Sequence, residues 1–143
     1  MAFENILVVC VGNICRSPIA EALLKDQYPS KHIDSAGLGA LVGNPVDPNS
    51  QEVMNPFDID MSNHIAKQIN EQLVMTADLI FTMSDSQTKW IEERWPHCRG
   101  KTFRIGHWID KDIADPHRHD KAAFEIARED IMHSLVPWTD KIS

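Results

Sequence analysis

The sequence contains few cysteines and no long hydrophobic segment. Three cysteines in 143 residues are an odd number and do not form the set expected of a disulfide framework, so we expect reduced thiols. The first residues, MAFENILVVCVGN, include neither the basic stretch nor the long apolar stretch of a signal peptide. No run approaches the roughly 18–20 apolar residues of a membrane span. The sequence therefore predicts a cytoplasmic protein that does not insert into membranes.

Basic residues are also scarce. Lys and Arg number 14 against 21 Asp and Glu, which gives a net charge of −7 and a pI near 5.4. No basic stripe is available to neutralise a nucleic-acid backbone, so we expect no nucleic-acid partner. This composition still allows a small local anion site.

Strand-like and helix-like segments alternate along the chain, without internal repeats or linkers. Short apolar segments predict strands at 6–9, 31–35, 77–83 and 102–105. Two predicted helices begin at Pro18, after a Ser17 cap, and at Pro48, after an Asp47 cap. A third directs Trp90, Ile91 and Trp95 inward and ends at Pro96. A fourth is amphipathic, with apolar residues at three- and four-residue steps from Phe124 to Trp138. We therefore predict one α/β domain over residues 1–143, with a central four-stranded parallel sheet and helices on both faces.

The most informative segment is VVCVGNICRSP, residues 8–18. It leads from the first predicted strand into a helix, where several backbone N–H groups and the helix dipole make an anion site. Gly12 permits close approach of a ligand, and Asn13 tolerates left-handed dihedrals. Arg16 adds a planar fork that suits two phosphate oxygens. The segment therefore predicts a phosphate-sized pocket at the carboxyl edge of the sheet.

Cys10 lies at the floor of this predicted pocket. The N–H groups, the dipole, Arg16 and the Ser17 hydroxyl all stabilise a thiolate. A buried structural cysteine is the plain alternative, and the neighbouring residues disfavour it. A nucleotide P-loop is disfavoured too, because its Gly-Lys-Ser/Thr ending is absent. We expect a cysteine nucleophile.

These residues resemble the Cys-x5-Arg-Ser loop of the low-molecular-weight protein tyrosine phosphatases. Asp34-Ser35-Ala36-Gly37 resembles the SAG turn of that family, and Asp115-Pro116 resembles its Asp-Pro loop. VVCVGNICRSP and SAGLGALVG are most similar to the bacterial members linked to exopolysaccharide export. The resemblance implies a phosphotyrosine protein as substrate, and a tyrosine autokinase controlling exopolysaccharide or capsule production as partner.

The resemblance also implies roles for named residues. Cys10 would attack phosphorus, Arg16 would hold the phosphate, and Asp115 would act as general acid and then as base. The phosphate-binding loop would comprise Val11, Gly12, Asn13, Ile14, Cys15, Arg16 and Ser17. Polar side chains bracing this loop would be Asn13, Ser17, Ser35 and His64, and the rim facing the substrate ring would include Leu41, Val42 and His117. No cofactor is implied.

The family pattern alone does not explain two residues, His117 and Cys15. The family usually has an aromatic residue after Asp-Pro, whereas this chain has His117. Cys15 shares the loop with Cys10, so it could trap an oxidised Cys10 as a disulfide or only fill space, and the sequence favours neither.

Three other functions are possible in principle. A thioredoxin-coupled arsenate reductase would need two further cysteines after the third strand, and 84–97 contain none. A phosphotyrosine-binding module without turnover would not need both Cys10 and Asp115. A metal site could form from the acidic and histidine residues crowded near Asp115, but loop polarity explains these more simply and we expect no metal. The residues considered are Asp110, Asp112, Asp115, His117 and His119.

Overall fold

The computed structural model describes residues 3–142, which form a single sheet covered by helices. The strands are β1 (Asn5–Cys10), β2 (His32–Gly37), β3 (Leu79–Thr82) and β4 (Thr102–Arg104), all parallel and ordered β2-β1-β3-β4. The helices are α1 (Arg16–Gln27), α2 (Pro48–Met54), α3 (Glu71–Thr76), α4 (Asp85–Arg94), α5 (Lys121–Leu135) and α6 (Thr139–Ile142). The predicted α/β class and four-stranded parallel sheet are confirmed.

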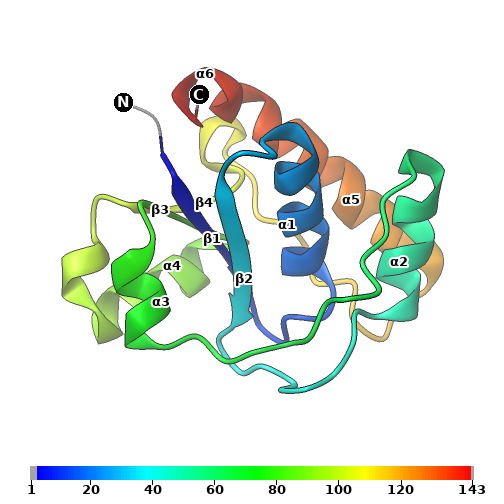
Figure 1. Cartoon of the computed structure of the whole chain (residues 1–143), viewed down its shortest axis with the longest axis horizontal. Coiled ribbons are helices and arrows are strands. Elements are labelled where there is room, and N and C mark those ends of the chain that lie inside the picture. Colours follow the sequence, from blue (N-terminus) through cyan, green and yellow to red (C-terminus); the bar gives the residue numbers. More distant parts are fainter. Residues whose placement is uncertain (1–2, 143) are drawn as a thin grey trace.

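The helices cover both faces of the sheet, because successive residues of β1 point to opposite sides. Ile6 and Val8 pack in a core with residues of α1, α2 and α5, whereas Leu7 and Val9 pack in a second core with residues of α3 and α4. Figure 1 shows α1, α2 and α5 on one side of the sheet and α3 and α4 on the other. Burial on both faces explains why β1 is continuously apolar.

The strand order places the carboxyl end of β1 in the middle of the sheet edge. The strand that follows β1 in the sequence, β2, lies on one side of it, and β3 lies on the other side. The strand order thus changes direction at β1, and ligands of open parallel sheets bind at the carboxyl ends of the strands where this happens. Cys10 is the last residue of β1 and is paired in register with Gly37, the last residue of β2. Cys10 therefore lies where this topology favours a ligand site.

Gly37 is required by close packing at this edge. A Cβ atom there would lie 2.5 Å from the carbonyl oxygen of Val11 and 3.0 Å from Ala40. The second strand was predicted to end at Ser35, before Ala36 and Gly37, and this was wrong. Ala36 and Gly37 continue β2 because they pair with Val9 and Cys10, the last two residues of β1.

Three other differences concern helices. α1 begins at Arg16, so Ser17 lies inside the helix and is not its cap. The helix predicted from Phe124 to Trp138 ends as α5 at Leu135, because Pro137 cannot continue the α-helical ladder, and Trp138 lies in the 3-10 turn that follows. The six-residue α3, capped by Asn70, was not predicted. The Asp47 cap of α2 is confirmed, with its carboxylate accepting a hydrogen bond from Asn49 N–H.

The longest helix, α5, has 15 residues. None of the helices in the part of the chain described has the length and apolarity needed to cross a membrane.

Candidate active site

The backbone after β1 turns its carbonyl groups outward and its N–H groups inward. The carbonyl oxygens of Cys10, Val11 and Gly12 accept from N–H groups of the loop after β2, at 2.9, 3.0 and 3.0 Å; the donors are Leu38, Gly39 and Leu41. The Ile14 carbonyl accepts from Asp47 N–H at 2.8 Å. Within residues 3–142, the N–H groups from Val11 to Arg16 have no hydrogen-bond partner. These free donors are what an oxyanion needs.

Gly12 and Asn13 shape this loop in different ways. Asn13 has a φ of 59°, in the left-handed region that asparagine tolerates. Gly12 is not in that region, and a Cβ there would make only ordinary contacts, 3.7 Å from Ile14 and 3.8 Å from Leu41. The fold therefore does not itself require glycine at position 12, which fits a role in admitting a ligand.

The sulfur of Cys10 lies 3.0 Å from the Ser17 hydroxyl oxygen. That oxygen already accepts a hydrogen bond from Asn13 Nδ2 at 2.8 Å. The amide orientation of Asn13 is fixed, because its Oδ1 accepts from Lys67 N–H at 3.0 Å. The hydroxyl proton of Ser17 is thus left for the sulfur, so Ser17 donates to Cys10 and favours the thiolate form.

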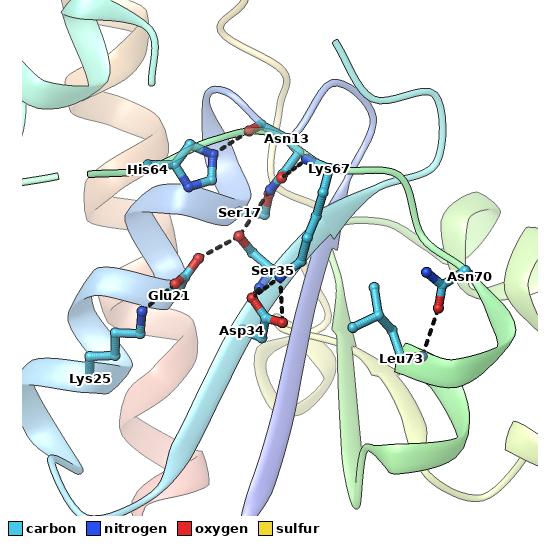
Figure 2. A network of polar contacts seen from close by, with 10 residues as sticks. All are labelled: Asn13, Ser17, Glu21, Lys25, Asp34, Ser35, His64, Lys67, Asn70 and Leu73. Atoms are coloured by element: carbon cyan, nitrogen blue, oxygen red, sulfur yellow. Dashed lines mark hydrogen bonds and ion pairs between the residues drawn. The ribbon is translucent and has the colours of Figure 1, made fainter. Parts of the chain in front are cut away.

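The same amide connects the loop to a wider polar network (Figure 2). Asn13 Nδ2 also donates to the Ser35 hydroxyl at 3.0 Å, and Ser35 donates to the Glu21 carboxylate. His64 Nε2 lies 2.7 Å from the Asn13 carbonyl and donates to it. Asn13, Ser17, Ser35 and His64, the four bracing residues expected from the sequence, therefore lie in one connected set of contacts.

The outer end of this network borders a polar cleft of about 820 Å³ beside α1. Glu21 and Lys25 line it from α1, while Asp34 and Lys67, which form an ion pair at 2.6 Å, line it from β2 and the loop before α3. Cys10 does not line this cleft. The cleft therefore lies behind the site and not over the nucleophile.

The Arg16 side chain is buried, and its Nε donor is unpaired in the described part of the chain. Its Nη1 donates to the Ile113 carbonyl at 2.7 Å, and its Nη2 lies 3.8 Å from Asp115 Oδ2. The Nε atom is buried and has no partner in the described part of the chain. A buried unpaired donor is costly unless a ligand satisfies it. Its presence beside the free N–H groups points to a bound anion.

Asp115 lies at the exposed end of this arrangement. Its side chain is 48% exposed, and its Oδ1 accepts from His117 N–H at 3.0 Å. Oδ2 faces Arg16. A carboxyl group here is open to solvent and close to the arginine that would hold phosphate, as proton transfer to a leaving group requires.

Cys15 differs from Cys10 in its surroundings. Its sulfur lies 3.9 Å from Asp47 Oδ2 and 3.9 Å from His117 Nδ1. Burial and the negative charge of Asp47 raise the pKa of the Cys15 thiol far above its usual range. Cys15 therefore remains a neutral thiol at physiological pH.

Exposed apolar side chains surround the loop. Leu41 is 42% exposed and lies next to Gly12, and Val42 and Val11 are also exposed. His117 is only half-buried, with its ring directed at Cys15. The structure thus leaves Leu41 and Val42 available as rim residues and brings His117 against the loop itself.

The acidic and histidine residues near Asp115 do not converge as the metal alternative would require. Asp110 and Asp112 both pair with Arg104. The group of candidate ligands found within 3–142 is instead Cys15, Asp47 and His117.

The sequence agrees with the model of one protein family over residues 5–143, described as low molecular weight phosphotyrosine protein phosphatase. The chain belongs to this family. It is a protein-tyrosine-phosphatase, a hydrolase of phosphate monoesters. A phosphatase of this name from Acinetobacter johnsonii, Ptp, is 51% identical, with 99% of this chain and 100% of that protein covered.

Other relatives of this phosphatase bear names of the exopolysaccharide-linked branch. Wzb of Salmonella typhimurium is 42% identical over 99% of this chain and 95% of its own. The structure of Vibrio vulnificus Wzb in complex with benzylphosphonate has a TM-score of 0.93, 40% identity and coverage of 98% and 99%. The expected resemblance to this branch is confirmed.

One structural neighbour of this phosphatase is named for phosphoarginine, not phosphotyrosine. YwlE, an arginine phosphatase, has a TM-score of 0.89 and 25% identity, with coverage of 96% and 95%. In that structure a serine replaces a cysteine and carries a phosphoryl group at the active site.

Two parts of the phosphatase site were not found from the sequence. Glu21 accepts a hydrogen bond from Ser35 and is the last residue of the polar network. Its spacing of four residues from Ser17 puts both on one side of α1, and this spacing could have indicated its role. The Ile113 carbonyl that positions Arg16 carries no signal in its side chain, because only its backbone takes part.

Proposed function

We propose that Cys10 is the nucleophile of a two-step phosphoryl transfer. The Cys10 sulfur forms a bond to phosphorus as the bond from phosphorus to the tyrosine oxygen breaks. The N–H groups of residues 11–16 and Arg16 hold the three remaining oxygens. The observation that carries this proposal is that Cys10, whose sulfur contacts the Ser17 hydroxyl at 3.0 Å, begins a loop in which the N–H groups and Arg16 Nε are unpaired within residues 3–142. The phosphorylated serine in YwlE supports the same covalent step.

Asp115 transfers a proton in both steps. It donates a proton to the departing tyrosine oxygen, and it then takes a proton from the water that attacks the cysteinyl phosphate. Phosphate and the Cys10 thiolate are released, so the enzyme returns to its starting state. The reaction as written uses no metal or other cofactor, so activity should survive EDTA.

The rim favours an aromatic phosphate ester over phosphoarginine. Leu41 and Val42 are exposed and apolar near Gly12, and such side chains pack well against a phenyl ring. A guanidinium group would need acceptors, and among the rim residues Leu41, Val42 and His117 the first two offer none on their side chains. We infer that phosphotyrosine in a protein is the substrate.

The physiological substrate is a tyrosine autokinase that controls exopolysaccharide or capsule production, and the enzyme acts in the cytoplasm. Support comes from the similarity to Wzb and from the sequence motifs shared with that branch. We further propose that residues 1–143 act as one phosphatase domain.

Activity assays and substrate trapping test these proposals. The purified chain should hydrolyse phosphotyrosine peptides much faster than phosphoarginine peptides of the same sequence. A preference for phosphoarginine would overturn the substrate class. The Cys10→Ser variant should capture a tyrosine-phosphorylated kinase from the source cell, while Cys10→Ser/Arg16→Lys, which lacks the phosphate clamp, should not. Equal capture by both variants would remove the kinase from the proposal.

A further inference from the structure

Three potential metal ligands meet beside the phosphate-binding loop, and none of their side chains forms or breaks a bond in the reaction proposed above. They are the Cys15 sulfur, Asp47 Oδ2 and His117 Nδ1. The sulfur lies 3.9 Å from each of the other two atoms, and all three lie within 4.8 Å of one another. They come from three segments far apart in the sequence, so only the fold brings them together.

Each ligand is held in place by a separate contact. Asp47 caps α2 through Oδ1, which accepts from Asn49 N–H at 2.9 Å, while Oδ2 faces the Cys15 thiol. His117 is fixed through its backbone, which donates to Asp115. Cys15 is buried at the start of α1. The backbone at each ligand is therefore held in place, while the three side chains keep the torsional freedom to adjust their spacing.

The spacing is close to that of a tetrahedral zinc site. Zn–S and Zn–N bonds of about 2.3 and 2.0 Å imply ligand atoms roughly 3.5 Å apart. The two separations from the sulfur, both 3.9 Å, exceed this by only a few tenths of an ångström, and the distance from Asp47 Oδ2 to His117 Nδ1 is at most 4.8 Å. Side-chain rotations supply shifts of this size. Asp47 and His117 are half-buried, so a fourth position is open to water.

We propose that Cys15, Asp47 and His117 bind Zn²⁺ and that the bound ion inhibits the phosphatase. Sulfur, imidazole nitrogen and carboxylate oxygen are the ligand types that Zn²⁺ takes in proteins. On binding, the S–H bond of Cys15 breaks, a Zn–S bond forms and the proton passes to solvent, with no change of oxidation state. Asp47 and Asp115 make the surroundings negative, against the opposing charge of Arg16, and so favour a cation.

Inhibition follows from what the ion would join. Cys15 lies in the loop whose N–H groups hold phosphate, and His117 lies two residues after Asp115. A shared ion ties these two segments together and limits the movement of Asp115 toward the leaving group. The rate of turnover should fall without loss of phosphate binding.

Cobalt provides a direct probe of the site. We would titrate Cys10→Ser protein with Co²⁺, which removes the nucleophilic thiol as a competing ligand. A thiolate-to-cobalt charge-transfer band should appear, and Zn²⁺ should displace it. The band should be absent from Cys10→Ser/Cys15→Ser. Failure to see the band, or its persistence without Cys15, would overturn the site.

Matched variants test the other two ligands. In the Cys10→Ser background, Asp47→Asn retains the helix cap but loses the charge, and His117→Tyr restores the residue type usual in this family. Each should weaken Co²⁺ binding by about tenfold or more. His119→Tyr changes a neighbouring exposed histidine and should have no effect. Equal weakening by His119→Tyr, or none by His117→Tyr, would contradict the assignment. Melting curves of all variants verify that they fold.

An activity measurement tests the inhibition, which rests on the proposed function. Zn²⁺ should lower kcat of the wild-type enzyme with little rise in KM, because the ion does not occupy the phosphate site. Each variant is compared with its own metal-free rate, and His117→Tyr should need about tenfold more Zn²⁺ for half inhibition. Purely competitive inhibition would instead indicate capture by Cys10 and overturn the regulatory part. Cobalt binding without any phosphatase activity would refute the proposed function and leave the site standing.

Discussion

The Ser17 hydroxyl donates its single proton to the sulfur of Cys10 across 3.0 Å. The direction is set by Asn13, whose amide donates to the Ser17 oxygen and in turn is oriented by Lys67 N–H. Ser17 thus connects the Cys10 sulfur to the hydrogen-bond network that orients its hydroxyl group.

Replacing Ser17 by alanine should slow turnover. The substitution removes a hydrogen bond to a charged sulfur, worth about 1.5–3 kcal/mol, so kcat for an aryl phosphate should fall by roughly tenfold or more. Steady-state kinetics measure this, with Ser62→Ala, an exposed serine away from the loop, as the control. Equal rates in both variants would show that Ser17 does not act on the sulfur.

Replacing Arg16 by lysine should abolish activity despite the retained charge. An ammonium group cannot reproduce the planar fork, and it cannot both bond the Ile113 carbonyl, as Nη1 now does at 2.7 Å, and present a second donor to phosphate. Vanadate binding, measured by calorimetry, should be lost in Arg16→Lys. It should persist in Cys10→Ser, which keeps the loop but cannot turn over. An active Cys10→Ser enzyme would refute the mechanism.

Replacing Asp115 by asparagine should affect substrates unequally. A general acid contributes about 10²–10⁴-fold, and this contribution matters most when the leaving oxygen is strongly basic. We therefore expect Asp115→Asn to slow phenyl phosphate far more than an activated nitrophenyl ester. Measuring kcat across a series of leaving groups tests this. A uniform loss across the series would mean that Asp115 is not the acid.

Replacing His117 by tyrosine should strengthen the binding of aryl phosphates. A phenol ring offers more stacking area than an imidazole, so KM for an aryl phosphate should fall, while KM for a non-aromatic phosphate should change little. The half-buried ring of His117 lies next to Cys15, which places it beside the loop. If both substrates respond alike, His117 is not part of the recognition wall.

Stability should fall at alkaline pH because of Cys15. Its thiol pKa is raised in the folded protein by burial and by Asp47, so the unfolded state ionises first as pH rises. The stabilising effect is complete below the unfolded pKa of about 8.5 and is lost progressively above it, by up to about 1.4 kcal/mol per pH unit. Urea unfolding between pH 7 and 10 should show a smaller decline in Cys15→Ser than in wild type. Parallel declines would exclude Cys15 as the source.

The sheet and the core of the site could be predicted because their signals are local. The apolar run of β1 and the Gly, Asn, Arg and Ser residues of one short loop carry both. The contact between the Ser17 hydroxyl and the Cys10 sulfur was expected from the sequence and is present in the structure. The helix cap expected of a serine before Pro18 is not formed, because α1 already begins at Arg16.

The parts that were missed depend on contacts between distant segments. Glu21 acts through Ser35 on β2, and Arg16 is held by a backbone carbonyl 97 residues away. The cluster of Cys15, Asp47 and His117 likewise joins three separate loops. α3 escaped notice for another reason: six residues are too few to display a helical period.

The outward carbonyl groups of the phosphate-binding loop have a consequence for binding entropy. Leu38, Gly39, Leu41 and Asp47 donate to carbonyls of this loop, and His64 adds a fifth donor. These contacts hold the loop in one conformation, so little conformational freedom is lost when substrate binds. The N–H dipoles of the loop need no reorientation when the phosphoryl group is transferred, because the loss of conformational entropy that orders them occurs when the chain folds.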